Sequence, residues 1–249
     1  MTQMPDAAGQ PRVTSGRGGF VFGFLAGAVA MALVTVVVGW ATGWWRVDAI
    51  DSSPAPVPAP TGTNAPLKPV IYLYPTAATD VTVTLSHPGR LAVSYPAYGD
   101  GWHVRAQPDG SLTDLATGRD LYALYYEGGR VVPAARTGEG FVVPGAQTAP
   151  FLEDALPRLG LSPREAEEFL IYWLPVLQAN PYTYLRFESA AEQAQVQALT
   201  VTPAPDTVIR VMMDWQRLDA PVPVVPQALT APPREGFVVV EWGGTPIPA

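Results

Sequence analysis

The feature that most constrains this chain is a run of 28 residues without a charged side chain, between Arg17 and Arg46. A helix needs about 20 apolar residues to cross a hydrocarbon core of roughly 30 Å, so this run is long enough. A cleaved signal peptide has a shorter apolar region, of about 7–15 residues, followed by small residues. Here the run ends at Trp44 and Trp45, a poor cleavage context. We therefore predict one N-terminal transmembrane helix over residues 19–45.

The basic residues on either side of this helix predict its orientation. Arg12 and Arg17 precede the helix, whereas the segment after it opens with Arg46 alone. Because basic residues are retained on the cytoplasmic side, we expect the N-terminus in the cytoplasm and the remainder of the chain outside it. The sequence thus predicts a single-pass signal-anchor protein of the plasma membrane.

Three glycines, Gly19, Gly23 and Gly27, recur on one face of the predicted helix. Small residues at this spacing let two membrane helices approach closely, which would support a homodimer through this face. The other explanation is that glycine is simply frequent in membrane helices.

Composition narrows the chemistry of the rest of the chain. There are no cysteines, which excludes disulfides, cysteine-ligated metals and cysteine nucleophiles. Two histidines, His87 and His103, cannot build a histidine-rich metal site, which leaves only an all-oxygen calcium site open. We predict no metal and no cofactor. The net charge is −7 and Lys68 is the only lysine, so the chain lacks the basic patch that nucleic-acid binding requires.

Residues 51–69 alternate proline with small residues and lack a periodic apolar pattern. Such a segment favours an extended polyproline II conformation and acts as a semi-rigid spacer. We therefore divide the chain into a cytoplasmic tail (1–18), a transmembrane helix (19–45), a proline-rich linker (46–68) and an extracytoplasmic β-rich domain (69–249).

Short segments of alternating apolar and polar residues, separated by turn residues, predict that the domain consists mostly of strands. Aromatic side chains bury large areas, so most aromatic residues of these segments are expected in the core. Many short strands with turns between them are typical of an antiparallel sandwich or a small barrel-like sheet. The segments are 69–75, 81–85, 91–95, 120–126, 183–187, 208–215 and 236–242, and the predicted aromatic core is Tyr72, Tyr74, Tyr122, Tyr126 and Trp173.

A two-helix insert over residues 148–178 interrupts the strands. Ser162 is followed by a proline and, three positions on, by Glu165, which is the pattern of a capping box at a helix N-terminus. Pro175 should kink or end the helix that follows. The pattern also allows a helical stretch over residues 190–199. The predicted fold class is therefore α+β, mostly antiparallel β with this insert, together with the transmembrane helix.

Several distinctive blocks run through the domain, namely KPVIYLYP at 68–75, YPAYGDGW at 95–102, YYEG at 125–128, YWLP at 172–175 and VEWGG at 240–244. On these blocks the chain resembles an uncharacterised bacterial protein family whose members share the opening block. The likeness spans nearly the whole domain. It implies a recurring bacterial domain and carries over no catalytic residue.

Acidic residues form the best candidate for catalysis. Glu127 ends an aromatic strand before two glycines, and Asp100 lies in a glycine-flanked loop close to Trp102 and His103. Two carboxylates about 5–10 Å apart hydrolyse glycosidic bonds, and Glu127 could pair with Asp100 or with Glu188. The structural alternative is that carboxylates at turns are solvated or bind backbone amides.

A binding surface is the second candidate. Tyr182, Tyr184, Arg186 and Glu188 share one strand face, while Arg210 and Asp214 share a face of another strand. Adjoining faces would form a polar, aromatic surface for a glycan or a peptide, and Trp102 could stack on a sugar ring. The alternative is an internal salt-bridge network across neighbouring strands, with the tyrosines packed over it.

We therefore expect a membrane-anchored, extracytoplasmic interaction or structural module of the bacterial cell envelope rather than an enzyme. Its expected partners are the membrane and either cell-wall glycan or an envelope protein, and not nucleic acid. The alternative is a glycan-directed hydrolase that uses Glu127 with Asp100 or Glu188. An enzyme would show two of these carboxylates in one pocket, and an interaction module would show an exposed aromatic patch.

Overall fold

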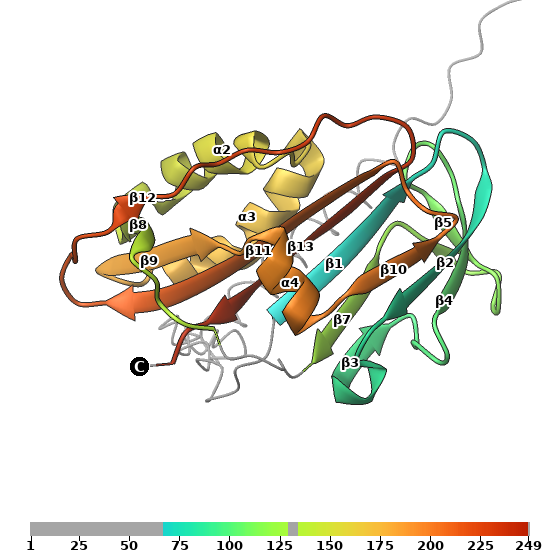
Figure 1. Ribbon diagram of the computed structural model, residues 1–249, viewed down its shortest axis with the longest axis horizontal. Helices are drawn as coiled ribbons and strands as arrows, with labels where there is room; N and C mark the ends of the chain where they lie inside the picture. The colour runs from blue at the N-terminus through green and yellow to red at the C-terminus, as the bar shows by residue number, and fades with distance from the viewer. Residues whose placement is uncertain (1–66, 129–133, 249) are drawn as a thin grey trace, which may run out of the picture. The chain divides into compact units, whose positions relative to one another are not determined.

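The structure is a computed structural model that describes residues 67–128 and 134–248 (Figure 1). The predicted cytoplasmic tail, the transmembrane helix with its three glycines, and the linker up to residue 66 lie outside the described residues. Within the described ranges, no helix is long and apolar enough to cross a membrane.

The described strands form two sheets (Figure 1). The eight-stranded sheet has the order β12 (Val225–Pro226), β8 (Glu139–Pro144), β9 (Tyr182–Phe187), β11 (Thr207–Leu218), β13 (Val238–Pro246), β1 (Leu67–Tyr74), β7 (Leu124–Gly128) and β3 (Leu91–Tyr95). The five-stranded sheet has the order β10 (Leu199–Thr202), β2 (Thr79–Leu85), β4 (Trp102–Ala106), β5 (Leu112–Asp114) and β6 (Asp120–Leu121). The helices are α2 (Thr148–Arg158), α3 (Pro163–Leu177) and α4 (Ala190–Val196), with 3₁₀ turns η1 (Pro88–Arg90) and η2 (Gly145–Gln147).

The predicted fold class is wrong in its architecture. The described chain is mostly β, and both sheets are open, because each ends in strands that pair on one side only. It has three α-helices in the described ranges, and α4 lies outside the expected insert. Strands β11 and β13 pair in parallel at the centre of the large sheet, as do β8 and β12 at its edge. Alternation shows that a strand has one buried face, but it does not show which strands become neighbours or whether a sheet closes.

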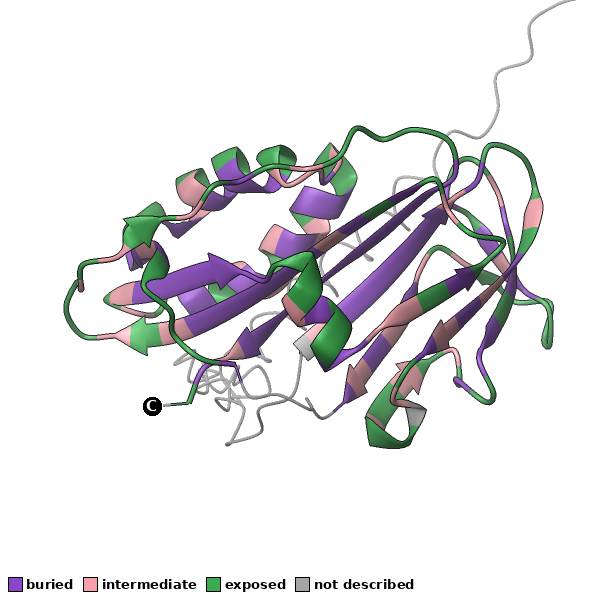
Figure 2. Cartoon of the chain, in the orientation of Figure 1, coloured by how far each residue is buried: buried purple, intermediate pink, exposed green. Residues whose placement is uncertain are grey.

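One face of the large sheet packs against α2 and α3. Alternate residues of β11, such as Ile209, Val211 and Met213, point into this core. At its centre the fully buried Trp173 of α3 meets the ring of Trp215 with 6.3 Å between ring centroids. Figure 2 shows the strands beneath these helices as mostly buried.

The opposite face of β13, β1 and β7 packs against the small sheet. Ile71 and Leu73 of β1 point towards Val81, Val83 and Val104 of the small sheet, and all are buried. Because Val70 and Tyr72 of the same strand belong to the helix-side core, β1 is buried on both faces. The result is three layers, with the helices on one face of the large sheet and the small sheet on part of the other.

Helix α3 begins as the sequence predicts. The Ser162 hydroxyl accepts a hydrogen bond from the Glu165 backbone N–H, and the Glu165 carboxylate accepts one from the Ser162 backbone N–H at 2.7 Å. The helix then continues through Pro175 to Leu177. Glu165 is fully buried and also pairs with Arg234 at 2.9 Å, so the cap ties α3 to the segment that leads into β13.

Gly244 of β13 offers a test of the helix-side core. A Cβ atom there would lie 2.6 Å from Cζ2 of Trp173 and 2.9 Å from the Met213 carbonyl oxygen. We expect Gly244→Ala to lower the free energy of unfolding by about 1–3 kcal/mol, because the core must shift to relieve this overlap. Urea unfolding followed by near-ultraviolet circular dichroism would measure it. Gly138→Ala is the control, because a Cβ at Gly138 meets nothing within 4 Å, and equal stability of the two variants would contradict the packing.

Because of Glu165, the stability of the fold is expected to depend on pH. Burial alone would raise the pKa of Glu165, but hydrogen bonds from Arg234, the Ser162 backbone and Tyr74 outweigh it and hold the pKa below its ordinary value of 4.5. A lowered pKa contributes stability that is present above pH 4.5 and is lost as the pH falls through the folded-state pKa. We expect Glu165→Gln to destabilise the protein at pH 7 and to weaken the dependence of stability on pH below 4.5. Denaturant unfolding between pH 7 and pH 3 measures both, and an unchanged pH profile would contradict this role.

Candidate functional site

The three candidate carboxylates lie apart. Asp100 is on a loop before β4, with its side chain 94% exposed and 3.4 Å from His103 Nε2. Glu127 lies in β7, whereas Glu188 directly follows β9, four strands away in the large sheet. At a strand spacing of about 4.8 Å this separates Glu127 and Glu188 by roughly 19 Å, well beyond the range for a glycosidase pair. Glu127 and Glu188 also lie on opposite faces of the large sheet. Glu127 is on the same face as Tyr125, which packs against the helix-side core, whereas the charge of Glu188 interacts with Arg210 on the other face.

The polar face of β9 lies inside the protein. Arg186 is paired with Asp214 at 2.8 Å and with Glu192 at 2.9 Å, and Asp214 is fully buried. Tyr184 is fully buried as well, and its hydroxyl donates to the Glu139 carbonyl at 2.6 Å. Tyr182, at the start of β9, is partly buried. This arrangement matches the internal salt-bridge network rather than a ligand surface.

A second buried network lies beside the first on the same face. The Tyr126 hydroxyl donates to Glu241 at 2.7 Å, and Arg210 donates to the same carboxylate and, at 2.9 Å, to the Gln197 carbonyl. Burial alone would lower the pKa of Arg210, but the charge of Glu241, the hydrogen bond to it and the neighbouring Tyr126 and Glu188 together outweigh burial and raise the pKa, so the guanidinium stays charged. These hydrogen bonds connect strands β7, β13 and β11 to Gln197 at the end of α4.

Trp102 is also part of the core. It is 2% exposed, its indole N–H donates to the Pro96 carbonyl at 2.9 Å, and its ring meets that of Tyr98 edge-on. Neither face of the Trp102 ring is accessible for stacking on a sugar. Trp102 therefore positions the loop before β4 instead of binding a ligand.

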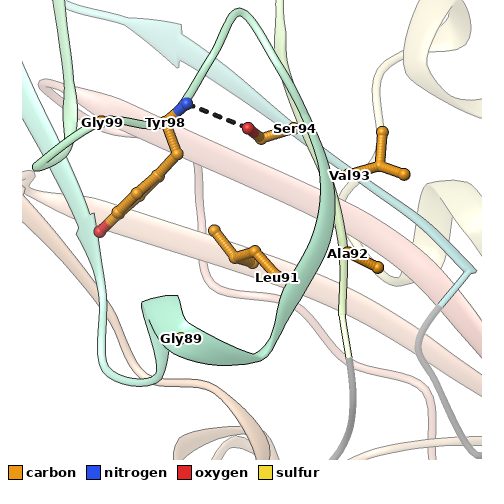
Figure 3. Close-up of a pocket in the computed structure, with 7 residues that line it drawn as sticks. All are labelled: Gly89, Leu91, Ala92, Val93, Ser94, Tyr98 and Gly99. Carbon is orange, nitrogen blue, oxygen red and sulfur yellow. Dashed lines mark hydrogen bonds between the residues drawn. The ribbon is translucent and has the colours of Figure 1, made fainter.

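A pocket of about 440 Å³ opens beside the edge strand β3 (Figure 3). Figure 3 shows Leu91 directed towards the ring of Tyr98, while Val93 points away from it. The Ser94 hydroxyl accepts a hydrogen bond from the Tyr98 backbone N–H at 3.0 Å, and the Tyr98 hydroxyl accepts one from the Leu85 backbone N–H at 2.8 Å. No charged residue lines this pocket, so it offers little to recognise a ligand.

Two further pockets, of about 380 and 530 Å³, share Lys68, Tyr122 and Glu168 and so form one continuous depression. It lies where the start of β1, the segment between β6 and β7, and α3 meet. We call it the tyrosine groove and define it by its aromatic and charged side chains. These are Lys68, Tyr95, Asp120, Tyr122, Tyr125, Arg164, Glu168 and Tyr172.

Three tyrosine rings of this groove are each covered on one face by a cation of the protein itself. The Lys68 ammonium lies 4.9 Å from the centroid of Tyr172, and the Arg164 guanidinium lies 5.2 Å from that of Tyr122. The Tyr95 ring is held by Arg119, which lies 5.8 Å from its centroid and donates to its hydroxyl at 3.0 Å. Such contacts fix the rings in place. Yet Tyr95 and Tyr122 are 50% and 53% exposed, so both still present large surfaces to solvent.

Glu168 is held rigidly in the wall of the groove. Its carboxylate accepts a hydrogen bond from the Tyr72 hydroxyl at 2.5 Å and one from Arg164 at 3.3 Å. Tyr72 is itself anchored by the Trp242 indole N–H at 3.2 Å. Burial, and then the bond to Glu168, raise the pKa of Tyr72, so it remains a donor. The Glu168 side chain is still 26% exposed, so it can contact a ligand.

Glu127 is the one candidate carboxylate that lies beside the groove. It accepts a hydrogen bond from the Lys68 backbone N–H at 3.3 Å. Burial and then a hydrogen bond to Glu127 raise the pKa of Tyr125, and burial and then the charge of Glu127 raise the pKa of Tyr172. Both tyrosines therefore keep their hydroxyl protons and act as neutral donors.

The backbone at Lys68 is strained. Its φ of 53° lies in the left-handed region, which an L residue with a side chain seldom adopts, and the pairing of β1 with β13 shifts register between Leu67 and Val70. A bulge of this kind re-aims a side chain, and strain of this kind persists where the surrounding structure enforces it. Here the bulge directs the only lysine of the chain onto Tyr172.

Sequence reasoning missed this groove. The sequence predicts Tyr122 in the core of a continuous strand over residues 120–126, but the strand is broken at Tyr122 and Ala123 between β6 and β7. The break turns Tyr122 outwards, so its assignment to the core is wrong. Nothing in the alternation marks the break. The unusual features that could have drawn attention were the density of tyrosines and the single lysine at the domain boundary.

Within the residues that the structure describes, no group of three histidine or acidic side chains is placed to hold a metal ion. No protein family matches the chain, and neither curated proteins nor solved structures gave a match. The groove must therefore be interpreted from its own chemistry.

Lys68 gives a direct test of the strained bulge. Both Lys68→Ala and Lys68→Gly remove the cation, but only glycine adopts the left-handed region without cost. We expect the glycine variant to be more stable than the alanine variant by about 1 kcal/mol. Val208, 44% exposed in the regular strand β11, is the matched control, because alanine should be the more stable replacement there. Denaturant unfolding of the four variants measures both differences, and the same order at both positions would contradict the strain.

Proposed function

We propose that this chain is a membrane-tethered, extracytoplasmic interaction module of the bacterial envelope, and that the tyrosine groove binds a peptide segment of a protein partner. The observation that carries the proposal is the groove itself, a continuous depression with exposed tyrosines, fixed charges of both signs and neutral hydroxyl donors. Exposed aromatic surface of this kind is a feature of binding sites.

The proposed location follows from the sequence. The uncharged run between Arg17 and Arg46 supports a single membrane-spanning anchor with a cytoplasmic N-terminus. The proline-rich residues that follow would hold the domain away from the bilayer. The likeness of residues 68–75 and later blocks to an uncharacterised bacterial family supports a recurring bacterial module.

Binding is favoured over glycan hydrolysis by the positions of the carboxylates. Glu127 and Glu188 lie about 19 Å apart on opposite faces of the large sheet, at roughly 4.8 Å per strand, and Asp100 belongs to a loop of the small sheet. Acid–base cleavage of a glycosidic bond needs two carboxylates around one bond. The groove is lined by the carboxylates of Asp120 and Glu168, with Glu127 at its side, and both Glu168 and Glu127 are engaged by donors of the protein.

The cations that cover the tyrosine rings of the groove favour a peptide ligand over a glycan. Sugars bind aromatic side chains through open ring faces, whereas Tyr172, Tyr122 and Tyr95 each have a face covered by Lys68, Arg164 or Arg119. Tyr95 and Tyr122 nevertheless remain about half exposed, and the Glu168 side chain is 26% exposed. These groups suit the carbonyls, amides and small apolar side chains of an extended peptide.

Site-specific photo-crosslinking in the bacterium that makes the protein would test this function. A benzophenone amino acid in place of Tyr122 should give a discrete covalent adduct with a protein. The same amino acid in place of Leu115, which is 51% exposed on the small sheet, should not. Adducts of equal yield at both positions, or none at Tyr122, would overturn the proposal.

Binding of the full chain in detergent to purified cell-wall glycan tests the other ligand class. We expect no saturable binding beyond that of a Tyr122→Ala variant, which should fold normally because Tyr122 is 53% exposed. Saturable binding that Tyr122→Ala abolishes would keep the groove as the site but replace the peptide with a glycan.

A further inference from the structure

We infer that the partner segment binds as an added strand along the outer edge of β3. Its side chains then point alternately to the two faces of the large sheet, into the pocket of about 440 Å³ on one face and towards the tyrosine groove on the other. This inference rests on the proposed function and deepens it, because it names the conformation of the segment and the order of its side chains.

Strand β3 is the outer strand best suited to accept another strand. In the described residues the two sheets end in β12 and β3 and in β10 and β6. Strands β12 and β6 have two residues each and contain Pro226 and Asp120, and short length, proline and charge all protect a strand edge. The exposed side chains of β10 are threonines. By contrast, β3 has five residues without charge or proline, and its Val93 and Tyr95 are 47% and 50% exposed.

The backbone of β3 can pair on its second side. Within the part of the chain that the structure describes, β3 pairs with β7 alone. In an antiparallel pair, alternate residues direct their N–H and C=O groups to the neighbouring strand, and the residues between them direct theirs outwards. The pairing is irregular between Leu91 and Val93 and regular from Val93 to Tyr95, so the latter residues supply the regular part of the template. An extended peptide binds to such a row of outward groups when it adds to a sheet.

The two cavities beside β3 lie on opposite faces of the large sheet. Leu91 and Tyr98, which line the pocket in Figure 3, pack in the core between the two sheets. Val70 and Tyr125, which line the tyrosine groove, pack in the core under the helices. Because successive side chains of a strand point to opposite faces, neighbouring residues of an added strand reach one cavity and then the other. The tyrosine groove is reached beside Tyr95, which belongs to β3 itself.

The two cavities select different side chains. The pocket beside β3 has no charged lining residue and suits an apolar side chain, although alone it offers little for recognition. The groove presents the carboxylates of Asp120 and Glu168 and the neutral hydroxyls of Tyr125 and Tyr172, so it suits a side chain that forms hydrogen bonds, such as an amide or a hydroxyl. The inferred partner segment therefore alternates apolar and hydrogen-bonding residues along β3.

The side chains of β3 favour a different protein over a second copy of this chain as the source of the added strand. Strand β3 carries two hydroxyls, those of Ser94 and Tyr95, and no amide or charged side chain. Both hydroxyls already accept hydrogen bonds, from the Tyr98 backbone and from Arg119. A second β3 strand would thus bring to the groove only apolar side chains and hydroxyls that are already engaged.

A phage-displayed library of random peptides of about ten residues, long enough to pair with all of β3, provides the probe for the full-length protein in detergent. We expect the selected peptides to alternate apolar and hydrogen-bonding residues. The best of them should bind Val93→Lys at least about tenfold more weakly, because a charge in the middle of an edge strand opposes pairing. Val225→Lys, 62% exposed on the other outer strand of the large sheet, is the matched control and should bind like the wild type. Fluorescence anisotropy of the labelled peptide measures these affinities.

Methylation of the peptide backbone separates strand addition from binding through side chains alone. An N-methyl group removes one N–H donor and blocks pairing on that side of the strand. Because only alternate N–H groups of an added strand face β3, methyl groups at every second position should weaken binding at least about tenfold, and those between them should have little effect. Equal losses at all positions, or no loss at any, would overturn strand addition.

Failure of this inference is distinguishable from failure of the proposed function. A library without a peptide that Val93→Lys weakens would overturn strand addition on β3, while a discrete protein adduct at Tyr122 in the photo-crosslinking experiment would still support the groove as a partner site.

A single introduced cysteine tests the second copy, since the chain has no cysteine of its own. Under mild oxidation, Val93→Cys should give no more disulfide-linked dimer than Val225→Cys, as measured by gel electrophoresis under denaturing conditions without reductant. A clear excess of dimer with Val93→Cys would overturn the inference in favour of pairing between two copies of β3.

Discussion

Burial of β1 on both faces is the constraint on which the described structure depends. Val70 and Tyr72 complete the core under the helices, while Ile71 and Leu73 complete the core under the small sheet. The neighbours of β1 on either side, β13 and β7, are bound to it by backbone hydrogen bonds. β1 therefore contributes to both cores, and a change in its register would move both sets of side chains to the wrong face.

The groove inherits its rigidity from this arrangement. Tyr72 points from β1 through the helix-side core to Glu168 of α3, and Trp242 of β13 donates to the Tyr72 hydroxyl. Glu168 is thus fixed by two strands and a helix, while Lys68 is fixed by the bulge at the start of the same β1 strand. A peptide that enters would meet a surface whose donors, acceptors and ring planes are already in position, which lowers the entropic cost of binding.

Sequence reasoning succeeded where the physical cause is local. The capping box of Ser162 and Glu165 needs only the first turn of a helix, and it is present. It failed where the outcome depends on segments distant in the sequence. The groove joins Lys68, Tyr122 and Glu168 from three separate elements, and the break that exposes Tyr122 leaves the apolar alternation unchanged. The same is true of Tyr184, whose face of β9 could be recognised from the sequence but not what covers it.

The position of β1 in the interior of the large sheet also determines how the domain would carry mechanical load. Under the anchoring proposed above, a pull between the membrane and a bound partner enters at Leu67, the first residue of β1. That strand is flanked by β13 and β7 rather than lying at the edge of the large sheet. A force along β1 is therefore shared by hydrogen bonds on both sides at once, instead of opening them one after another as at an edge strand. The proposed tether would thus join the fold at a strand that is paired on both sides.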